Sequence, residues 1–179
     1  MEKWTFKTDI YAGPDSLDRL DSLRGERILI VCDPFMVGSE TFETLVKRLE
    51  QQNQVTVYSD VVPDPPIAKV VKGIEFLNTV GPTTAIAIGG GSALDAAKVM
   101  WCFYEHPQLE FADIITPGSM PPLRNKARFV AIPSTSGTAS EITAFSVITD
   151  TENHIKYPIV AADMVPDIAI LDPALPTKM

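Results

Sequence analysis

The sequence predicts an α/β protein built on a doubly wound parallel sheet, and three observations support this. Apolar runs such as Ile28–Cys32 and Thr84–Ile88 show no polar alternation, so both faces of these strands must be covered. Amphipathic stretches such as Ser39–Gln52 place their apolar residues on one helical face. Strands and helices also alternate through the first half of the chain, and successive βα units form a right-handed, doubly wound sheet.

The predicted elements follow one another from the amino terminus. Trp4–Tyr11 alternates loosely and predicts a strand with one wet face, either an edge or an arm. Asp15–Leu23 has leucines at a spacing of three and predicts a short amphipathic helix. The other predicted strands are Ile28–Cys32, Val55–Tyr58, Thr84–Ile88, Arg128–Ile132 and Ile168–Asp172, and the other predicted helices are Ser39–Gln52, Ile67–Thr79 and one that runs from Ser92 through Tyr104.

The remaining segments are irregular or form a hairpin. Val61–Pro66 is a stiff proline loop, and His106–Lys126 holds four prolines and predicts a surface excursion with at most one helical turn. Ala144–Thr149 and Ile155–Val160 flank turn residues and predict a β-hairpin. No helix follows Ile168–Asp172, so we expect exposed apolar surface there, and hence association or poor solubility.

Composition and charge exclude several classes of protein. The chain has 179 residues, 45% of them hydrophobic, which is enough for a core and excludes general disorder. Its net charge of -8 argues against a nucleic-acid partner, and no apolar run approaches the ~20 residues of a membrane helix. The start at Met1–Trp4 lacks the pattern of a secretion signal, so a cytoplasmic protein is expected. Cys32 and Cys102 lie in separate apolar segments and are expected to be buried, reduced thiols.

The segment Gly89–Ser92 joins a predicted buried strand to a predicted helix. Glycine lets the backbone approach a bulky anion, and the unpaired N–H groups at a helix start favour a phosphate. Ser92 and Asp95 have the spacing of a capping box. The segment matches neither the Gly-x-Gly-x-x-Gly fingerprint nor a phosphate loop with Gly-Lys-Ser/Thr. A tight turn that needs glycine only for its geometry is the alternative interpretation.

A hydroxyl-rich segment, Pro133–Glu141, follows another predicted strand, and its Thr138 and Glu141 again match a capping box. Its hydroxyls could donate to a phosphate or ribose, although a well-capped polar loop is the alternative. Asp33 ends the first buried strand, where it could accept both ribose hydroxyls of an adenosine or simply start a turn. Lys156 could balance phosphate charge or be solvated. The two histidines, at 106 and 154, do not make a metal site.

Several of these segments, taken in order, resemble the iron-containing (group III) alcohol dehydrogenases. They are Val61–Pro65, Ala87–Lys98 and Ile132–Thr143, extended by Lys156–Pro158 and Pro166–Pro173, and they span nearly the whole chain. The sequence is most similar to 1-propanol dehydrogenases and to the alcohol dehydrogenase half of bifunctional aldehyde–alcohol dehydrogenases. Glycerol dehydrogenase and dehydroquinate synthase share the glycine segment but resemble the hydroxyl-rich segment less.

The resemblance implies a Rossmann-like domain over residues 1–179, with an added β-hairpin, like the amino-terminal domain of dehydroquinate synthase. In the family this domain binds NAD(P). By motif, Gly90, Gly91 and Ser92 would hold the pyrophosphate. Asp95 would brace that helix start or lie near the nicotinamide.

The resemblance assigns further cofactor contacts. Thr135, Ser136 and Thr138 would line the phosphates and ribose, and Phe145 and Lys156 would border the nicotinamide. Asp33 matches the carboxylate at the adenosine ribose, which favours NAD over NADP. Asp64 stands where the family often has Asn and adds negative charge near the cofactor, and Ala139 stands where glycine is common.

The family's metal, Fe²⁺ or Zn²⁺, is held by an aspartate and three histidines in an all-helical domain, expected downstream of Met179. The resemblance therefore implies the NAD-binding domain of a homodimeric alcohol dehydrogenase, inactive alone, whose parent interconverts a short-chain primary alcohol and its aldehyde. A bacterial microcompartment is the alternative to a cytoplasmic address. A stand-alone nucleotide-binding or assembly module and a glycerol dehydrogenase-like polyol oxidoreductase are the alternative functions.

Overall fold

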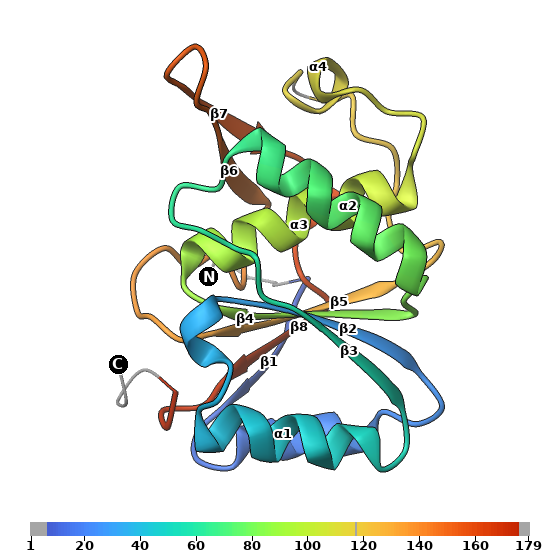
Figure 1. Cartoon of the computed structure of the whole chain (residues 1–179), viewed down its shortest axis with the longest axis vertical. Coiled ribbons are helices and arrows are strands. Elements are labelled where there is room, and N and C mark those ends of the chain that lie inside the picture. The colour runs from blue at the N-terminus through green and yellow to red at the C-terminus, as the bar shows by residue number, and fades with distance from the viewer. Residues whose placement is uncertain (1–6, 117, 176–179) are drawn as a thin grey trace, which may run out of the picture.

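The computed structural model describes residues 7–116 and 118–175. Its centre is a six-stranded sheet in the order β1-β8-β5-β4-β2-β3, in which every pairing is parallel (Figure 1). The predicted doubly wound parallel sheet is thereby confirmed. The strands are β1 (Asp9–Ala12), β2 (Arg27–Cys32), β3 (Gln54–Tyr58), β4 (Thr84–Gly89), β5 (Arg128–Pro133) and β8 (Ile168–Leu171).

Helices cover both faces of this sheet, as its unbroken apolar strands require (Figure 1). On one face the odd-numbered residues of β2, such as Leu29, pack with α2 (Ile67–Val80) and α3 (Gly91–Glu105). On the other face the even-numbered residues, such as Ile28, pack with α1 (Glu40–Glu50). Two separate cores result, one on each side of the sheet. The free thiols Cys32 and Cys102 are buried in them, as predicted.

The segment predicted as a helix over Asp15–Leu23 is a 3₁₀-helix, η1 (Ser16–Ser22). A leucine spacing of three matches the 3.0-residue period of that helix, which aligns Leu17 and Leu20 on one face. These leucines pack in one cluster with Ile168 and Ile170 of β8. The expectation that the last strand is uncovered is therefore wrong, because its cover comes from the start of the chain.

The amino-terminal strand is an edge of the sheet rather than an arm. Asp9–Ala12 pairs in parallel with β8, so β8 lies inside the sheet, between β1 and β5. The first residues of the predicted strand, Trp4–Phe6, lie outside the described residues.

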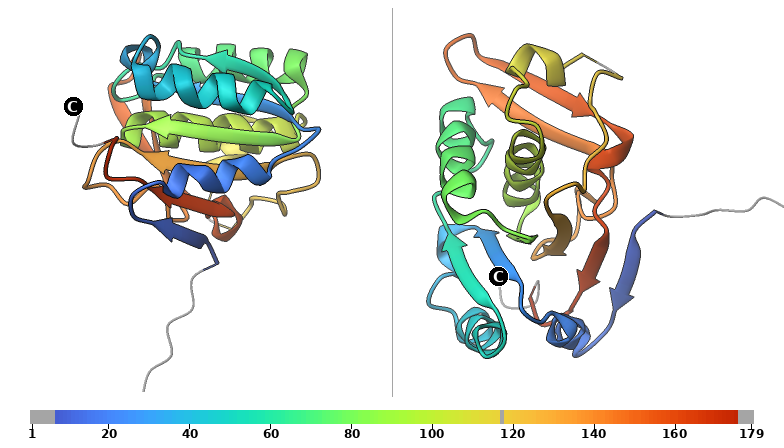
Figure 2. Two further views of the ribbon diagram at one scale, coloured as in Figure 1. Left: turned by 90° about the horizontal axis from the view of Figure 1, so that it is seen from below. Right: turned by 90° about the vertical axis from the view of Figure 1, so that its right-hand side faces the viewer.

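The predicted hairpin is confirmed as β6 (Phe145–Asp150) and β7 (Ile155–Val160), which form a separate antiparallel sheet. It lies beyond α3, on the side away from the six-stranded sheet (Figures 1 and 2). The excursion before β5 contains one short helix, α4 (Phe111–Ile114), as predicted. Phe111 contacts Tyr157 of the hairpin edge to face, with ring centroids 5.4 Å apart.

The topology directs attention to one rim of the sheet. After β2 the chain enters a short 3₁₀-helix, η2 (Pro34–Met36), and passes to α1 on one face, whereas after β4 it passes to α3 on the other. Ligands of open α/β sheets bind in the crevice that such a divergence leaves at the carboxyl ends of the strands. The register pairs Cys32 with Ile88 and Gly89 with Pro133, so the segments after β2, β4 and β5 meet at this rim.

A last 3₁₀-helix, η3 (Ala162–Met164), connects the hairpin to β8. Within residues 7–116 and 118–175, no helix combines the length and the apolar character needed to cross a membrane.

Candidate functional site

The glycine segment forms the start of α3. The helix begins at Gly91, with Gly90 as its N-cap, and the N–H groups of Ala93 and Leu94 donate to the Gly90 carbonyl. The N–H groups of Gly91 and Ser92 belong to the first turn, where an α-helix offers no internal acceptor. They face outward together with the positive end of the helix dipole. The predicted capping box of Ser92 and Asp95 is wrong, because the N-cap is Gly90 and the helix starts two residues too early for Ser92 to cap it.

Asp33, directly after β2, contacts this helix start from one side. Its Oδ2 accepts a hydrogen bond of 2.9 Å from the Gly90 N–H. Burial raises the pKa of the half-buried Asp33 carboxyl, and the Gly90 hydrogen bond opposes that rise. A Cβ at Gly89, which has φ +150°, would collide with Asp33 Oδ2, so glycine is required there by close approach.

The hydroxyl-rich segment contacts the helix start from a second side. A Cβ placed on Gly90 would lie 3.6 Å from Thr135 Cγ2, and one placed on Gly91 would lie 2.6 Å from Thr138 Cγ2. The predicted capping box of Thr138 and Glu141 is wrong, because no helix begins here. Instead, Thr138 Oγ1 accepts hydrogen bonds from the Ser140 N–H and hydroxyl at 3.3 and 3.0 Å. Ala139 has φ 55°, a left-handed conformation that interrupts any helix at this point.

Asp64 and Lys156 close a third side. The Asp64 N–H donates to Ser92 Oγ at 3.3 Å, and the Asp64 carboxylate accepts from Lys156 Nζ at 2.6 Å. The proline loop and the hairpin thus meet over the second residue of α3. Four segments that lie far apart in the sequence therefore meet around this helix start.

Asp95 lies deeper than the other candidate residues and is almost fully buried. Its Oδ2 accepts from the Val147 N–H at 2.9 Å, and its carbonyl accepts from the Ser146 hydroxyl at 2.9 Å. Burial raises the pKa of the Asp95 carboxyl. Asp95 therefore attaches the hairpin to α3.

Lys98, one turn further along α3, has no exposed surface. Its Nζ donates to the carbonyls of Thr143 and Phe145 at 2.7 and 3.0 Å. Burial lowers the pKa of Lys98 to about 8, against the opposing effects of the Asp95 and Glu141 carboxylates. Lys98 thus fixes the segment that leads into β6, where the Phe145 side chain is exposed.

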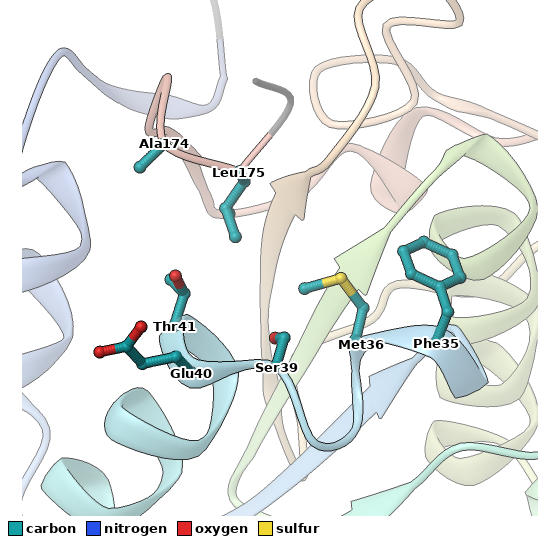
Figure 3. Close-up of a pocket in the computed structure, with 7 residues that line it drawn as sticks. All are labelled: Phe35, Met36, Ser39, Glu40, Thr41, Ala174 and Leu175. Carbon is teal, nitrogen blue, oxygen red and sulfur yellow. The ribbon is translucent and has the colours of Figure 1, made fainter. Parts of the chain in front are cut away.

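Two cavities open beside these residues. The smaller has a volume of about 260 Å³ and lies between the hydroxyl-rich segment and the end of β8. It is lined by Pro133, Thr135, Ser136, Glu141, Leu171, Asp172 and Pro173. The larger has a volume of about 580 Å³ and lies on the Asp33 side, between η2 with the start of α1 and residues 174–175 (Figure 3). Its lining is Phe35, Met36, Ser39, Glu40, Thr41, Ala174 and Leu175.

Two residues of this region, Lys98 and Ser134, were not among the predicted site residues. Lys98 ends the segment Ala87–Lys98, and the spacing of three between Asp95 and Lys98 could have indicated that they share a helix face. Ser134 begins the run of hydroxyls. Its N–H donates to the Gly89 carbonyl at 2.8 Å, while its buried hydroxyl has no hydrogen-bond partner among the described residues.

No metal can be assigned to the residues described here. Over residues 7–116 and 118–175, no three side chains of His, Cys, Asp or Glu lie close enough together to hold an ion. His106 Nε2 is 2.7 Å from the Pro122 carbonyl oxygen, and His154 lies in the turn between β6 and β7 with φ 56°.

Comparison with known proteins gives a consistent result. The family model of iron-containing alcohol dehydrogenases matches residues 7–173. The NADPH-dependent butanol dehydrogenase of Clostridium saccharobutylicum is 45% identical over all of this chain, which covers 47% of that protein. The 1-propanol dehydrogenase of Citrobacter freundii is 39% identical over 98% of this chain and 43% of its own length. An aldehyde-alcohol dehydrogenase of Streptococcus pneumoniae is 42% identical over 98% of this chain and 21% of its own length.

Solved structures agree with these relatives. The iron-containing alcohol dehydrogenase from Thermococcus thioreducens superposes with a TM-score of 0.88 and 32% identity, over 99% of this chain and 48% of its own. The sulfoacetaldehyde reductase from Bifidobacterium kashiwanohense, solved in complex with NAD⁺, superposes with a TM-score of 0.83 and 26% identity. The match covers 98% of this chain and 47% of the reductase. The chain thus spans about half the length of these structures and less than half of the curated relatives above.

Proposed function

The chain belongs to the iron-containing alcohol dehydrogenase family, and on that premise we propose that residues 1–179 form an NAD-binding domain. The dinucleotide places its diphosphate at the start of α3. In a longer enzyme this domain serves the interconversion of a short-chain primary alcohol and its aldehyde, by hydride transfer to or from NAD. The names of the butanol, propanol and aldehyde–alcohol dehydrogenases among its relatives support that substrate class.

The convergence of Asp33, Thr135 and Thr138 on the start of α3 is the observation that carries this proposal. The N–H groups of Gly91 and Ser92, with the positive end of the helix dipole, suit a phosphate. Gly90 leaves a cradle there, because a Cβ would lie between Thr135 and Asp33, 3.6 Å from the threonine and 3.9 Å from the carboxylate. The residues present therefore fit a diphosphate.

The adenosine half of the dinucleotide would lie on the Asp33 side. One Asp33 oxygen accepts from Gly90, which leaves lone pairs on the carboxylate for ribose hydroxyls. The largely apolar 580 Å³ cavity begins two residues later, at Phe35, and offers room for the adenine ring (Figure 3). A 2′-phosphate would face the Asp33 carboxylate, so NAD is preferred over NADP. One relative is named NADPH-dependent, so the names of the relatives do not support a preference for NAD. The preference is argued from the Asp33 carboxylate alone.

Bound NAD would supply the nicotinamide carbon that accepts or donates hydride. The residues of this chain bind and orient the cofactor. The hairpin would border the nicotinamide with Phe145 and Lys156, which share its exposed face, because 145 and 149 lie on one side of β6 and Lys156 pairs with Thr149. No step is assigned to a metal through the residues described.

A titration of the folded chain with NADH and NADPH, followed by nicotinamide fluorescence, tests the proposal. Gly90 has φ -74°, a conformation open to any residue, so Gly90→Val preserves the backbone and fills the cradle. We expect it to weaken NADH binding at least about tenfold, which is the cost of roughly 1.4 kcal/mol. Asp33→Ala should allow NADPH to bind, whereas Asp18→Ala, an equal loss of charge at an exposed ion pair with Arg48, should not. A folded wild-type chain that binds neither dinucleotide would contradict the proposal.

A further inference from the structure

The proline loop before α2 is attached to the hairpin by its backbone. The Thr149 N–H donates to the Pro65 carbonyl at 2.9 Å, and Pro66 forms a bridge with Thr149. Across the hairpin, Thr149 pairs with Lys156. Main-chain contacts therefore bring Asp64 within reach of Lys156, so their ion pair follows from the fold.

Asp64 is also attached to the start of α3. Its N–H donates to Ser92 Oγ, and its φ of 49° is left-handed, a conformation that Asp and Asn tolerate better than most residues. The carboxylate consequently stands beside the helix start at which a diphosphate is proposed to bind. Asp64 therefore adds a negative charge next to a proposed anion-binding site.

An incoming anion can replace Asp64 as the partner of Lys156. The N–O distance of the pair is 2.6 Å, but the Lys156 and Asp64 side chains are 56% and 67% exposed. Exposed ion pairs are weak, because water competes for both charges, so an anion that enters the site can compete for the lysine. Lys98 offers no such charge, because it is buried and donates to two carbonyls.

We propose that Asp64 selects ligands by their charge. The Asp64 carboxylate acts as an internal counter-anion for Lys156. A phosphate at the start of α3 therefore gains this lysine only by displacing the Asp64 carboxylate. Each further phosphate on the ligand is also repelled by Asp64. The site consequently accepts the diphosphate of a dinucleotide and disfavours a nucleoside triphosphate. This inference rests on the proposed function and adds the residue that sets the charge limit of the same site.

Asp64→Asn is the informative substitution, because Asn keeps the shape of the side chain and suits the left-handed backbone. Removal of the charge should tighten NADH binding about threefold, because a unit charge at an exposed site interacts only weakly with a ligand. The gain for ATP, which carries more charge, should be larger, about tenfold. Both gains should shrink at high salt, because the interaction is screened.

Two controls separate this mechanism from a general loss of negative charge. Asp60→Asn removes one charge from the segment between β3 and α2, but Asp60 pairs with Lys69 of α2, so the affinities should stay unchanged. In a Lys156→Met background, Asp64→Asn should lose the part of the gain that comes from freeing the lysine, whereas the extra gain for ATP, which comes from direct repulsion, should remain. Calorimetry would measure ATP and inorganic pyrophosphate, and nicotinamide fluorescence would measure NADH.

The outcomes distinguish this inference from the proposed function. If wild type binds NADH and Asp64→Asn binds it no more tightly, the inference is overturned and the function stands. If NADH does not bind but pyrophosphate binds more tightly to Asp64→Asn, the charge selection stands without the dinucleotide. If neither wild type nor Asp64→Asn binds any of the three probes, the proposed function and the charge selection are both overturned. A structural role of Asp64 would weaken binding in the variant, the opposite of the expected change.

Discussion

The two ends of the β6–β7 hairpin are held in different ways. At the inner end, Asp95 and Lys98 of α3 bind the backbone at Thr143, Phe145 and Val147, and both side chains are buried. At the outer end, Lys156 is bound by Asp64 at the surface. The hairpin thus has buried charged contacts at one end and a solvent-exposed ion pair at the other.

This contrast indicates which lysine is available to a ligand. Breaking a buried charged contact leaves a desolvated partner behind, which is costly. Breaking an exposed pair costs little, because water replaces the partner. Buried charges therefore fix the inner end of the hairpin. The outer end is held by the backbone hydrogen bond between Thr149 and Pro65, so its lysine can change partners without unfolding the hairpin.

Lys98→Met tests the inner end and should have the largest effect. It retains most of the side-chain volume but removes both donors and leaves the buried Asp95 without its neighbouring cation. We expect the free energy of unfolding, measured in urea, to fall by about 3 kcal/mol. The same substitution at exposed Lys72 of α2 is the control and should change it by less than about 0.5 kcal/mol. An unchanged stability in Lys98→Met would mean that the burial cost of the charge cancels its hydrogen bonds.

The pH dependence of stability is a second test of the inner end. Burial lowers the pKa of Lys98 from 10.5 to about 8. Between these values the unfolded chain holds a proton that the folded chain has released, so the free energy of unfolding rises with pH. Wild type should gain roughly 2–3 kcal/mol relative to Lys98→Met from pH 8 to 10.5, and less than about 0.5 kcal/mol below pH 8. Comparison with the variant removes the contributions of the tyrosines and thiols, and a constant difference would place Lys98 in contact with water.

The fold was largely predictable because its signals are local. Unbroken apolar runs such as Ile28–Cys32 identify strands covered on both sides, and Gly89–Ser92 marks the turn into α3. The cover of β8 was not predictable in this way. Leu17 and Leu20 reach it from the other end of the chain, and no local pattern records which distant segment packs on which strand.

The site was predictable as a set of residues but not as a set of contacts. Position at the carboxyl ends of strands indicated that Asp33, Gly90 and Thr135 lie together, and they do. The two capping boxes failed because a spacing of three does not fix where a helix starts, and the positive φ of Ala139 is invisible in the sequence. Burial separates Asp95, which serves the hairpin, from the residues at the surface.

Lys156→Met tests the outer end and should have the smallest effect on stability. Lys156 and Asp64 are both more than half exposed, so the loss of their pair should change the free energy of unfolding in urea by less than about 0.5 kcal/mol. Asp64→Asn should behave alike, and the double variant should show a coupling energy of only a few tenths of a kcal/mol. A cost near that of Lys98→Met would make both ends structural. Lys156 would then be held as firmly as Lys98, and a ligand could not take it from Asp64 without disturbing the hairpin.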